Sequence, residues 1–123
     1  MSNPTEAVTT GLMRLALDGS AMRHQAIAAN IANATTTGYV PVRVSFENQL
    51  QKARDRFQNG ESFQTVAADL GAVIESDDAP GASVAVDIQA AELAQNVVHY
   101  QALLKGWSKR TSILASAINE GKR

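Results

Sequence analysis

The chain contains no cysteine and few aromatic residues. The lack of cysteine excludes a disulfide framework and any metal site with cysteine ligands. Its 123 residues include one Trp, two Tyr and three Phe, and alanine makes up much of the 45% apolar fraction. Packing between alanine-rich helices buries little area per residue, so the composition fits a subunit of an assembly better than a self-sufficient globule.

Long apolar runs and a strong net charge are also missing. No run approaches the ~20 residues needed to cross a bilayer, and the N-terminus lacks the basic region and apolar core of a secretory signal. The formal net charge of -1 gives no electrostatic reason to expect nucleic acid or an anionic membrane as a partner. Composition alone therefore predicts a cytoplasmic protein that does not bind nucleic acid.

Residues that could carry chemistry are sparse and poorly arranged. Asp18, Ser20 and His24 include the residue types of a hydrolase triad, but they fall within two turns of one predicted helix, where no nucleophile elbow can form. His24 and His99 have no second metal ligand at suitable spacing, and the acidic turn at residues 75–78 lacks the oxygen spacing of a calcium site. We expect no catalysis, no metal, no cofactor and no small-molecule substrate.

The N-terminal region has a helical pattern from about Glu6 to Asn33. Its small and apolar residues recur at alternating steps of four and three, which places them on one face of a helix. Gly11 and Gly19 lie inside this pattern, and each costs a helix about 1 kcal/mol relative to alanine. The residues on this face are Val8, Leu12, Leu15, Gly19, Met22, Ala26 and Ala29.

The C-terminal region has a heptad pattern, which predicts one helix from about Ile88 to Asn119, on the order of 48 Å long at 1.5 Å per residue. We predict that its seam holds the terminal helices and neighbouring subunits together. One heptad position is occupied by Ala90, Val97, Leu104, Thr111 and Ile118, and the other by Leu93, Tyr100, Trp107 and Leu114. The residues assigned to the assembly seam are Leu93, Val97, Tyr100, Leu104 and Trp107.

Three regions follow from these patterns. Residues 1–39 form the N-terminal helix and a turn, residues 40–83 an irregular connection with a short helix near 46–57, and residues 84–123 the C-terminal heptad helix. Within the connection, residues 40–46 alternate with period two and predict an extended segment. Phe63–Val66 and Gly71–Ile74 are predicted to be short strands.

The predicted fold is mainly α, with two long terminal helices forming an antiparallel coiled-coil-like pair joined by an irregular middle region with short extended segments. An apolar stripe of this kind is also typical of a core helix in an ordinary bundle. Only about 50 residues remain to cover two long helices, which is too little. We therefore expect neighbouring subunits to bury the remaining faces.

The segment from Ala29 to Tyr39 ends the first helix with amides, hydroxyls and a glycine. Asn and Thr side chains favour the end of a helix, because they can hydrogen-bond to nearby backbone groups in non-helical conformations. Gly38 can adopt the φ values that a sharp turn after the helix requires. The residue order resembles the signature of bacterial flagellar rod and hook proteins, Asn-x-Ala-Asn-x-x-Thr-x-Gly-Tyr. The matching positions are Asn30, Ala32, Asn33, Thr36, Gly38 and Tyr39.

Two further segments narrow the resemblance to the proximal rod proteins: Phe46-Glu47 with Leu50, and residues 86–101. The chain departs from the family pattern at Thr37, where proline is usual, and at two further positions, Val40 and Ser45. Losing proline makes the exit less rigid. None of the three departures removes a donor or a glycine that the turn requires.

The resemblance implies a non-enzymatic structural subunit of the flagellar rod, packed in a helical array around an export channel and transmitting torque. It implies export through the flagellar type III apparatus into the basal body, within the periplasm, which overrides the cytoplasmic prediction. It also implies partners: further copies or homologous rod subunits, the rod-base adaptor protein and membrane ring, and other proximal and distal rod proteins. Carried over from the family motif, Asn30, Asn33, Thr36, Gly38 and Tyr39 would fix the junction after the first helix.

Two alternatives remain open. The chain could be another member of the flagellar axial family, against which the C-terminal resemblance argues. It could instead be a soluble helical-hairpin adaptor or chaperone, which would be a stable, monodisperse protein on its own, whereas a rod subunit would have loose termini before assembly.

Overall fold

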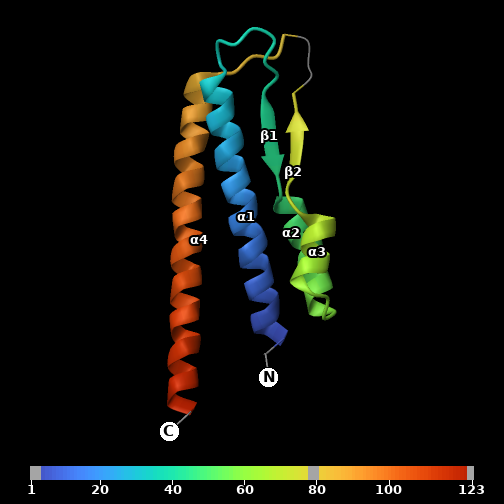
Figure 1. Cartoon of the computed structure of the whole chain (residues 1–123), viewed down its shortest axis with the longest axis vertical. Coiled ribbons are helices and arrows are strands. Elements are labelled where there is room, and N and C mark those ends of the chain that lie inside the picture. Colours follow the sequence, from blue (N-terminus) through green and yellow to red (C-terminus); the bar gives the residue numbers. More distant parts are fainter. Residues whose placement is uncertain (1–3, 78–80, 122–123) are drawn as a thin grey trace.

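The computed structural model describes residues 4–77 and 81–121 of the chain (Figure 1). Two long helices flank a middle region with two short helices and a two-stranded sheet. In chain order the elements are α1 (Pro4–Ala32), β1 (Val42–Ser45), α2 (Glu47–Gln58), α3 (Phe63–Leu70), β2 (Val73–Ser76) and α4 (Val86–Gly121).

The terminal helices α1 and α4 lie side by side and run in opposite directions (Figure 1). The predicted mainly helical fold with a long terminal helix pair is therefore confirmed. With 29 and 36 residues the helices differ in length, and α4 extends beyond the start of α1. No helix within the described residues is long and apolar enough to cross a membrane.

A first hydrophobic core joins α1 to α2 and α3. Its fully packed members are Leu15 from α1, Ala53 and Phe57 from α2, and Val66 from α3. The Phe57 ring stacks on that of Phe63, with centroids 6.5 Å apart. This core lies on the face of α1 away from α4, so α1 is covered on two sides.

Two glycines in α1 make room for aromatic rings. A Cβ atom added at Gly11 would lie 2.7 Å from the ring of Phe57, and one added at Gly19 would overlap the ring of Phe46. Phe46 precedes α2 and Phe57 lies near its end, so the two glycines let the whole length of α2 approach α1. This close approach accounts for glycines that cost a helix about 1 kcal/mol each.

The prediction of a strand at Phe63–Val66 is wrong, because these residues begin α3. The Ser62 side chain caps the helix by accepting a hydrogen bond from the Thr65 backbone N–H at 3.3 Å. Val66 then points into the first core. Arg56 also ties α3 to the end of α2, through ion pairs with Glu61 at 2.6 Å and Asp69 at 2.9 Å.

β1 and β2 form an antiparallel pair, with register from Val42 opposite Ser76 to Ser45 opposite Val73. β1 lies next to α1, and β2 lies on the outside with all four of its residues exposed. The predicted extended segment at residues 40–46 contains β1. The strand expected at Gly71–Ile74 starts two residues later, at Val73.

The stripe of α4 that faces α1 is rotated relative to the predicted seam. Leu93, Tyr100, Trp107 and Leu114 are half-buried, as that pattern expects. The other predicted heptad position is mostly exposed, including Leu104 at 42% and Ile118 at 59%. Its place in the interface is taken by the preceding residue of each heptad, which bonds to a polar group of α1 or, in the case of Leu103, packs on apolar residues. These residues are Gln89, Asn96, Leu103 and Arg110.

Candidate functional site

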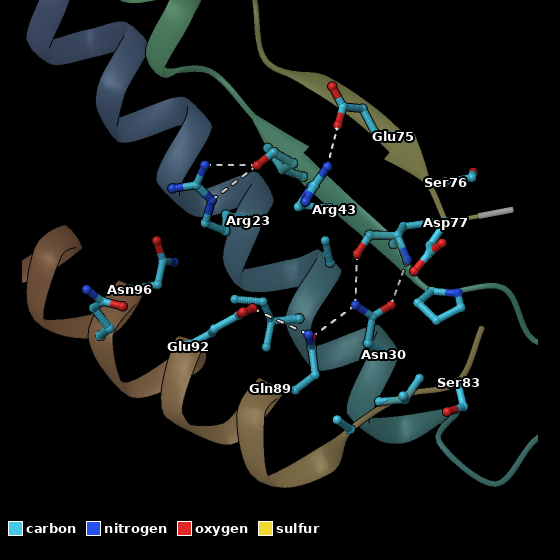
Figure 2. A pocket seen from close by; sticks show the side chains of 18 of the residues that line it. Arg23, Asn30, Arg43, Glu75, Ser76, Asp77, Ser83, Gln89, Glu92 and Asn96 are labelled. Atoms are coloured by element: carbon cyan, nitrogen blue, oxygen red, sulfur yellow. Dashed lines mark hydrogen bonds and ion pairs between the residues drawn. The ribbon is translucent and has the colours of Figure 1, made fainter. Parts of the chain in front are cut away.

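Asn30 is the centre of the junction between α1 and β1, where it is 2% exposed. Its Oδ1 atom accepts hydrogen bonds from the Tyr39 hydroxyl at 2.8 Å and the Val42 backbone N–H at 3.0 Å. Its Nδ2 group donates to the Val42 carbonyl at 2.8 Å and to Gln89 Oε1 at 3.0 Å (Figure 2). An amide has two donors and two principal acceptor sites, so the hydrogen-bonding capacity of Asn30 is filled.

The Asn30 side chain takes the place of a neighbouring strand on the inner edge of β1. The Asp77 N–H donates to the Pro41 carbonyl at 2.9 Å, which makes these two residues a hydrogen-bonded pair of the antiparallel ladder. The backbone groups of the next residue, Val42, therefore point away from β2 and toward α1. Asn30 bonds to both the N–H and the carbonyl of Val42. This fixes the position along α1 at which β1 begins and the direction in which β1 runs.

The remaining signature residues form the turn itself. Asn33 donates through Nδ2 to the Ala29 carbonyl at 2.9 Å, and its Oδ1 accepts from the Thr36 hydroxyl at 3.2 Å. The Tyr39 N–H donates to the Thr36 carbonyl at 3.2 Å. Gly38 has a φ of 78° and nothing within 4 Å of a Cβ position, so its contribution is conformational and not a matter of space. The structure thus brings all five predicted junction residues together, with Asn30 in the last turn of α1 and the other four in the segment that follows the helix.

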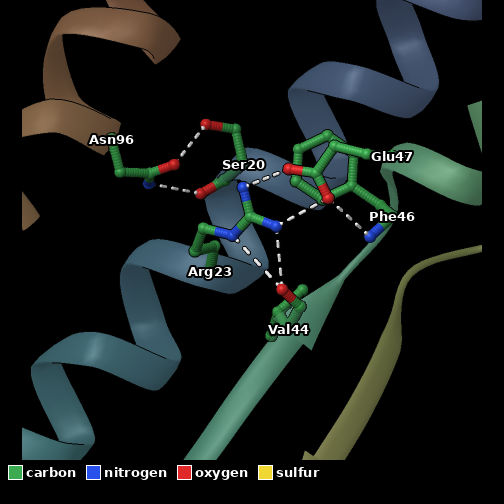
Figure 3. Close-up of polar contacts among 6 residues, drawn as sticks. All are labelled: Ser20, Arg23, Val44, Phe46, Glu47 and Asn96. Carbon is green, nitrogen blue, oxygen red and sulfur yellow. Dashed lines mark hydrogen bonds and ion pairs between the residues drawn. The ribbon is translucent and has the colours of Figure 1, made fainter. Parts of the chain in front are cut away.

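Arg23 provides a second connection between α1 and the strand, which sequence reasoning missed. Its guanidinium donates to both oxygens of Glu47, at 2.6 and 2.9 Å, and to the Val44 carbonyl at 2.9 and 3.2 Å (Figure 3). It also lies over the Phe46 ring, 4.5 Å from the centroid. Glu47 belongs to one of the segments that carry the family resemblance, which was the available signal.

The Arg23 guanidinium, through this bidentate hydrogen bond, lowers the pKa of Glu47 from 4.5 to about 2. Because the pKa is lower in the folded state, the pair stabilises the fold above about pH 4.5 and loses this contribution as the pH falls toward 2. The Glu47 side chain is 60% exposed, so solvent screening limits the effect.

We expect Glu47→Gln to lower the free energy of unfolding by about 1 kcal/mol or less at pH 7 and to have little effect near pH 2. The measurement is urea unfolding of wild type and variant across this pH range. Glu120→Gln, on the exposed end of α4, is the control. Its free energy of unfolding should change with pH in the same way as that of wild type. A constant difference between Glu47→Gln and wild type at every pH would contradict the assignment.

A buried polar pair joins the two long helices. The Ser20 hydroxyl donates to Asn96 Oδ1 at 3.0 Å, and Asn96 Nδ2 donates to the Ser20 carbonyl at 2.8 Å (Figure 3). The residues are 2% and 6% exposed. A polar pair inside an apolar helix interface penalises other registers, so it specifies how α4 aligns with α1.

The predicted assembly-seam residues divide into two groups. Leu93, Val97, Tyr100 and Trp107 are half-buried, whereas Leu104 is exposed to solvent. The half-buried group lies where α4 borders α1. Leu104 instead lies on the outer surface of the helix pair, where it is open to a neighbouring molecule.

The residues considered for catalysis form no catalytic arrangement. The Ser20 hydroxyl is bonded to Asn96, while Asp18 and His24 are exposed. Among residues 4–77 and 81–121, no three His, Asp or Glu side chains gather in a way that could hold a metal ion. The predicted acidic turn includes Asp78, which lies outside the described residues.

A groove of about 760 Å³ lies between α4 and the β1–β2 sheet, with α1 at its base (Figure 2). Its lining mixes apolar residues such as Ile27 with charged ones such as Arg23, Asp77 and Glu92. Figure 2 shows that Arg23, Asp77 and Glu92 come from separate parts of the chain. The groove leaves one side of the α1–α4 pair uncovered, next to the junction.

Comparison with known proteins finds a similarity to a flagellar protein. No protein-family model matches the chain. The chain is 29% identical over 116 residues to the flagellar basal body rod protein FlgB of Bacillus subtilis (strain 168), a match that covers 87% of this chain and 90% of that protein. The resemblance indicated by the junction motif is confirmed: the chain is similar over most of its length to a flagellar basal-body rod protein.

Proposed function

We propose that this chain is a structural subunit of the proximal flagellar rod, which assembles in a helical array to form part of a hollow shaft that transmits torque. The observation that carries the proposal is the buried Asn30 network. In a chain similar to FlgB over most of its length, the signature residues form the connection between α1 and β1. Such a junction sets the angle between a long helix and the rest of the subunit, which a regular array requires.

The proposal includes the partners and location of a rod subunit. Its neighbours are further copies or homologous rod proteins, with the rod-base adaptor protein and membrane ring on one side and other proximal and distal rod proteins on the other. It reaches the basal body in the periplasm by type III export. Leu93, Val97, Tyr100 and Trp107 hold α4 against α1 in the subunit, and Leu104 contributes to contacts between subunits.

Electron microscopy of envelopes from a strain with this gene deleted tests the proposal. We expect membrane rings without rods or hooks, and restoration of both by a plasmid copy. Intact rods and hooks in the deletion strain would overturn the proposal and favour the adaptor or chaperone alternative. That alternative also requires the purified protein to be monodisperse and to resist proteolysis at both ends.

A matched pair of glycine substitutions tests the role of the junction. Gly38 and Gly60 have φ values of 78° and 86°, and neither has an atom within 4 Å of a Cβ position. Valine at either site should therefore lower the free energy of unfolding by a similar amount, about 1–2 kcal/mol. We expect Gly38→Val to reduce swimming in soft agar far more than Gly60→Val, because only Gly38 lies in the junction. Equal motility at equal stability would contradict this role.

A further inference from the structure

One face of α4 combines large exposed apolar residues with unpaired charges. Ile88, Val98 and Ile113 are 57%, 67% and 59% exposed. With 100° of rotation per residue, these three side chains point within about 80° of one another around the helix axis. They lie on the side of the helix away from the residues that contact α1. Three large apolar side chains exposed along one face of a helix are available for contact with another molecule.

Charges on the same face are separated by sign along the helix. Glu92 lies in the N-terminal half, and Lys105 and Lys109 lie in the C-terminal half, all three exposed. Within residues 4–77 and 81–121, no salt bridge joins any of the three to another charged side chain. The helix dipole does not account for the lysines, because its effect is confined to the terminal turns and the last turn of α4 contains no basic residue.

The two flanks of this face carry different residues. Glu92 and Ile113, three heptads apart, lie on the flank next to the groove, which Glu92 itself lines. Val98 and Lys105, one heptad apart, lie on the opposite flank. When parallel helices pack, each flank faces the opposite flank of its neighbour, whereas antiparallel helices bring like flanks together. Parallel packing therefore places Glu92 against Lys105 and Val98 against Ile113.

Both pairings require nearly the same displacement along the helix. Glu92 and Lys105 are separated by 13 positions in the sequence, and Val98 and Ile113 by 15. A shift of about 14 residues, or two heptads, satisfies both and corresponds to roughly 21 Å at 1.5 Å per residue. The same shift brings Ile88 level with Ala102, whose small side chain leaves room for it.

We infer that this face of α4 is an interface between two copies of the chain, packed parallel and displaced by about 14 residues. In-register parallel packing would leave Glu92 and Lys105 unpaired, 13 positions apart, and antiparallel packing would bring Lys105 against Val98. Because the two copies contribute different residues to the contact, it is heterologous. The inference rests on the proposed rod function and adds the contact surface, orientation and displacement.

Disulfide trapping tests the geometry, since the chain has no cysteine of its own. Concentrated full-length Val98→Cys and Ile113→Cys proteins are mixed and oxidised mildly at low ionic strength. The two proteins are mixed in equal amounts, and we expect the mixed dimer to exceed either homodimer at least tenfold, where random pairing would give twofold. Ser108→Cys, outside this face, is a control that should give no cross-link. Dimers of Val98→Cys alone, a statistical mixture or no cross-link at all would overturn the inference.

Charge reversal provides a second, independent test. Glu92→Lys and the double variant Lys105→Glu with Lys109→Glu should each weaken self-association at least tenfold in sedimentation equilibrium, and combining all three changes should restore it. Failure of the combination would overturn the inference.

Immunoblots of purified basal bodies separate the two proposals. If the cysteine variants are present in rods but do not cross-link, only the inferred interface is refuted. If the wild-type chain is absent from rods, the proposed function is refuted.

Discussion

Asn30→Leu should lower the free energy of unfolding by about 3 kcal/mol or more, because each buried polar group left without a partner costs about 1–3 kcal/mol. Leucine is similar in size but leaves the Val42 N–H, the Val42 carbonyl and the Tyr39 hydroxyl without the partner they have in the native chain. Urea unfolding followed by circular dichroism measures the change. We also expect loss of motility, since β1 would no longer leave α1 at a fixed angle.

Asn33→Leu is the matched control for this variant. Asn33 belongs to the same motif but is only half-buried, and its side chain bonds to Ala29 and Thr36 within the turn. Its loss should cost about 1 kcal/mol, the usual net value of a partly exposed hydrogen bond. Equal effects of the two substitutions would show that Asn30 has no special role at the edge of β1.

Phe57→Ala should destabilise the chain by about 3–5 kcal/mol, the usual range for removing a buried phenylalanine. The ring is 7% exposed, packs with Leu15, Ala53 and Val66, and lies over Gly11. The resulting cavity cannot close easily, because helices on both sides border it. Thermal unfolding of the purified variant measures the loss, and a change below about 1 kcal/mol would contradict the packing described here.

A double-mutant cycle isolates the contact between Gly11 and Phe57. Gly11→Ala alone should destabilise, since its Cβ would lie 2.7 Å from the ring, even though alanine favours a helix. In a Phe57→Leu background the same change should be neutral or stabilising, because the smaller side chain leaves space. We expect a coupling free energy of about 1 kcal/mol or more, whereas additive effects would exclude direct contact.

Local periodicity was sufficient to predict both long helices and their pairing. The predicted ranges, from Glu6 to Asn33 and from Ile88 to Asn119, differ from α1 and α4 by only one or two residues at each end. Long amphipathic patterns determine helix boundaries well, because each added turn repeats the same signal. The motif likewise located the turn, since asparagine and glycine have specific conformational roles there.

Features that depend on distant partners could not be predicted in this way. α3 was mistaken for a strand, although Ser62 as cap and the positions of Phe63, Val66 and Leu70 fit a short helix. The register of α4 was missed because Asn96, a polar residue, occupies a buried position that only its partner Ser20 makes favourable. Local sequence contains no information about a partner 76 positions away.

The separation of contacts along the chain has a consequence for the order of folding. Helices α1, α2 and α3 and both strands lie within residues 4–77, whereas the bonds from α4 to α1 join residues as far apart as Glu6 and Arg110, 104 positions. Contacts between distant residues require closure of a long loop, so we expect α4 to dock last. Until α4 docks, the inferred face has no fixed orientation, so we expect copies to associate through it only after the chain has folded.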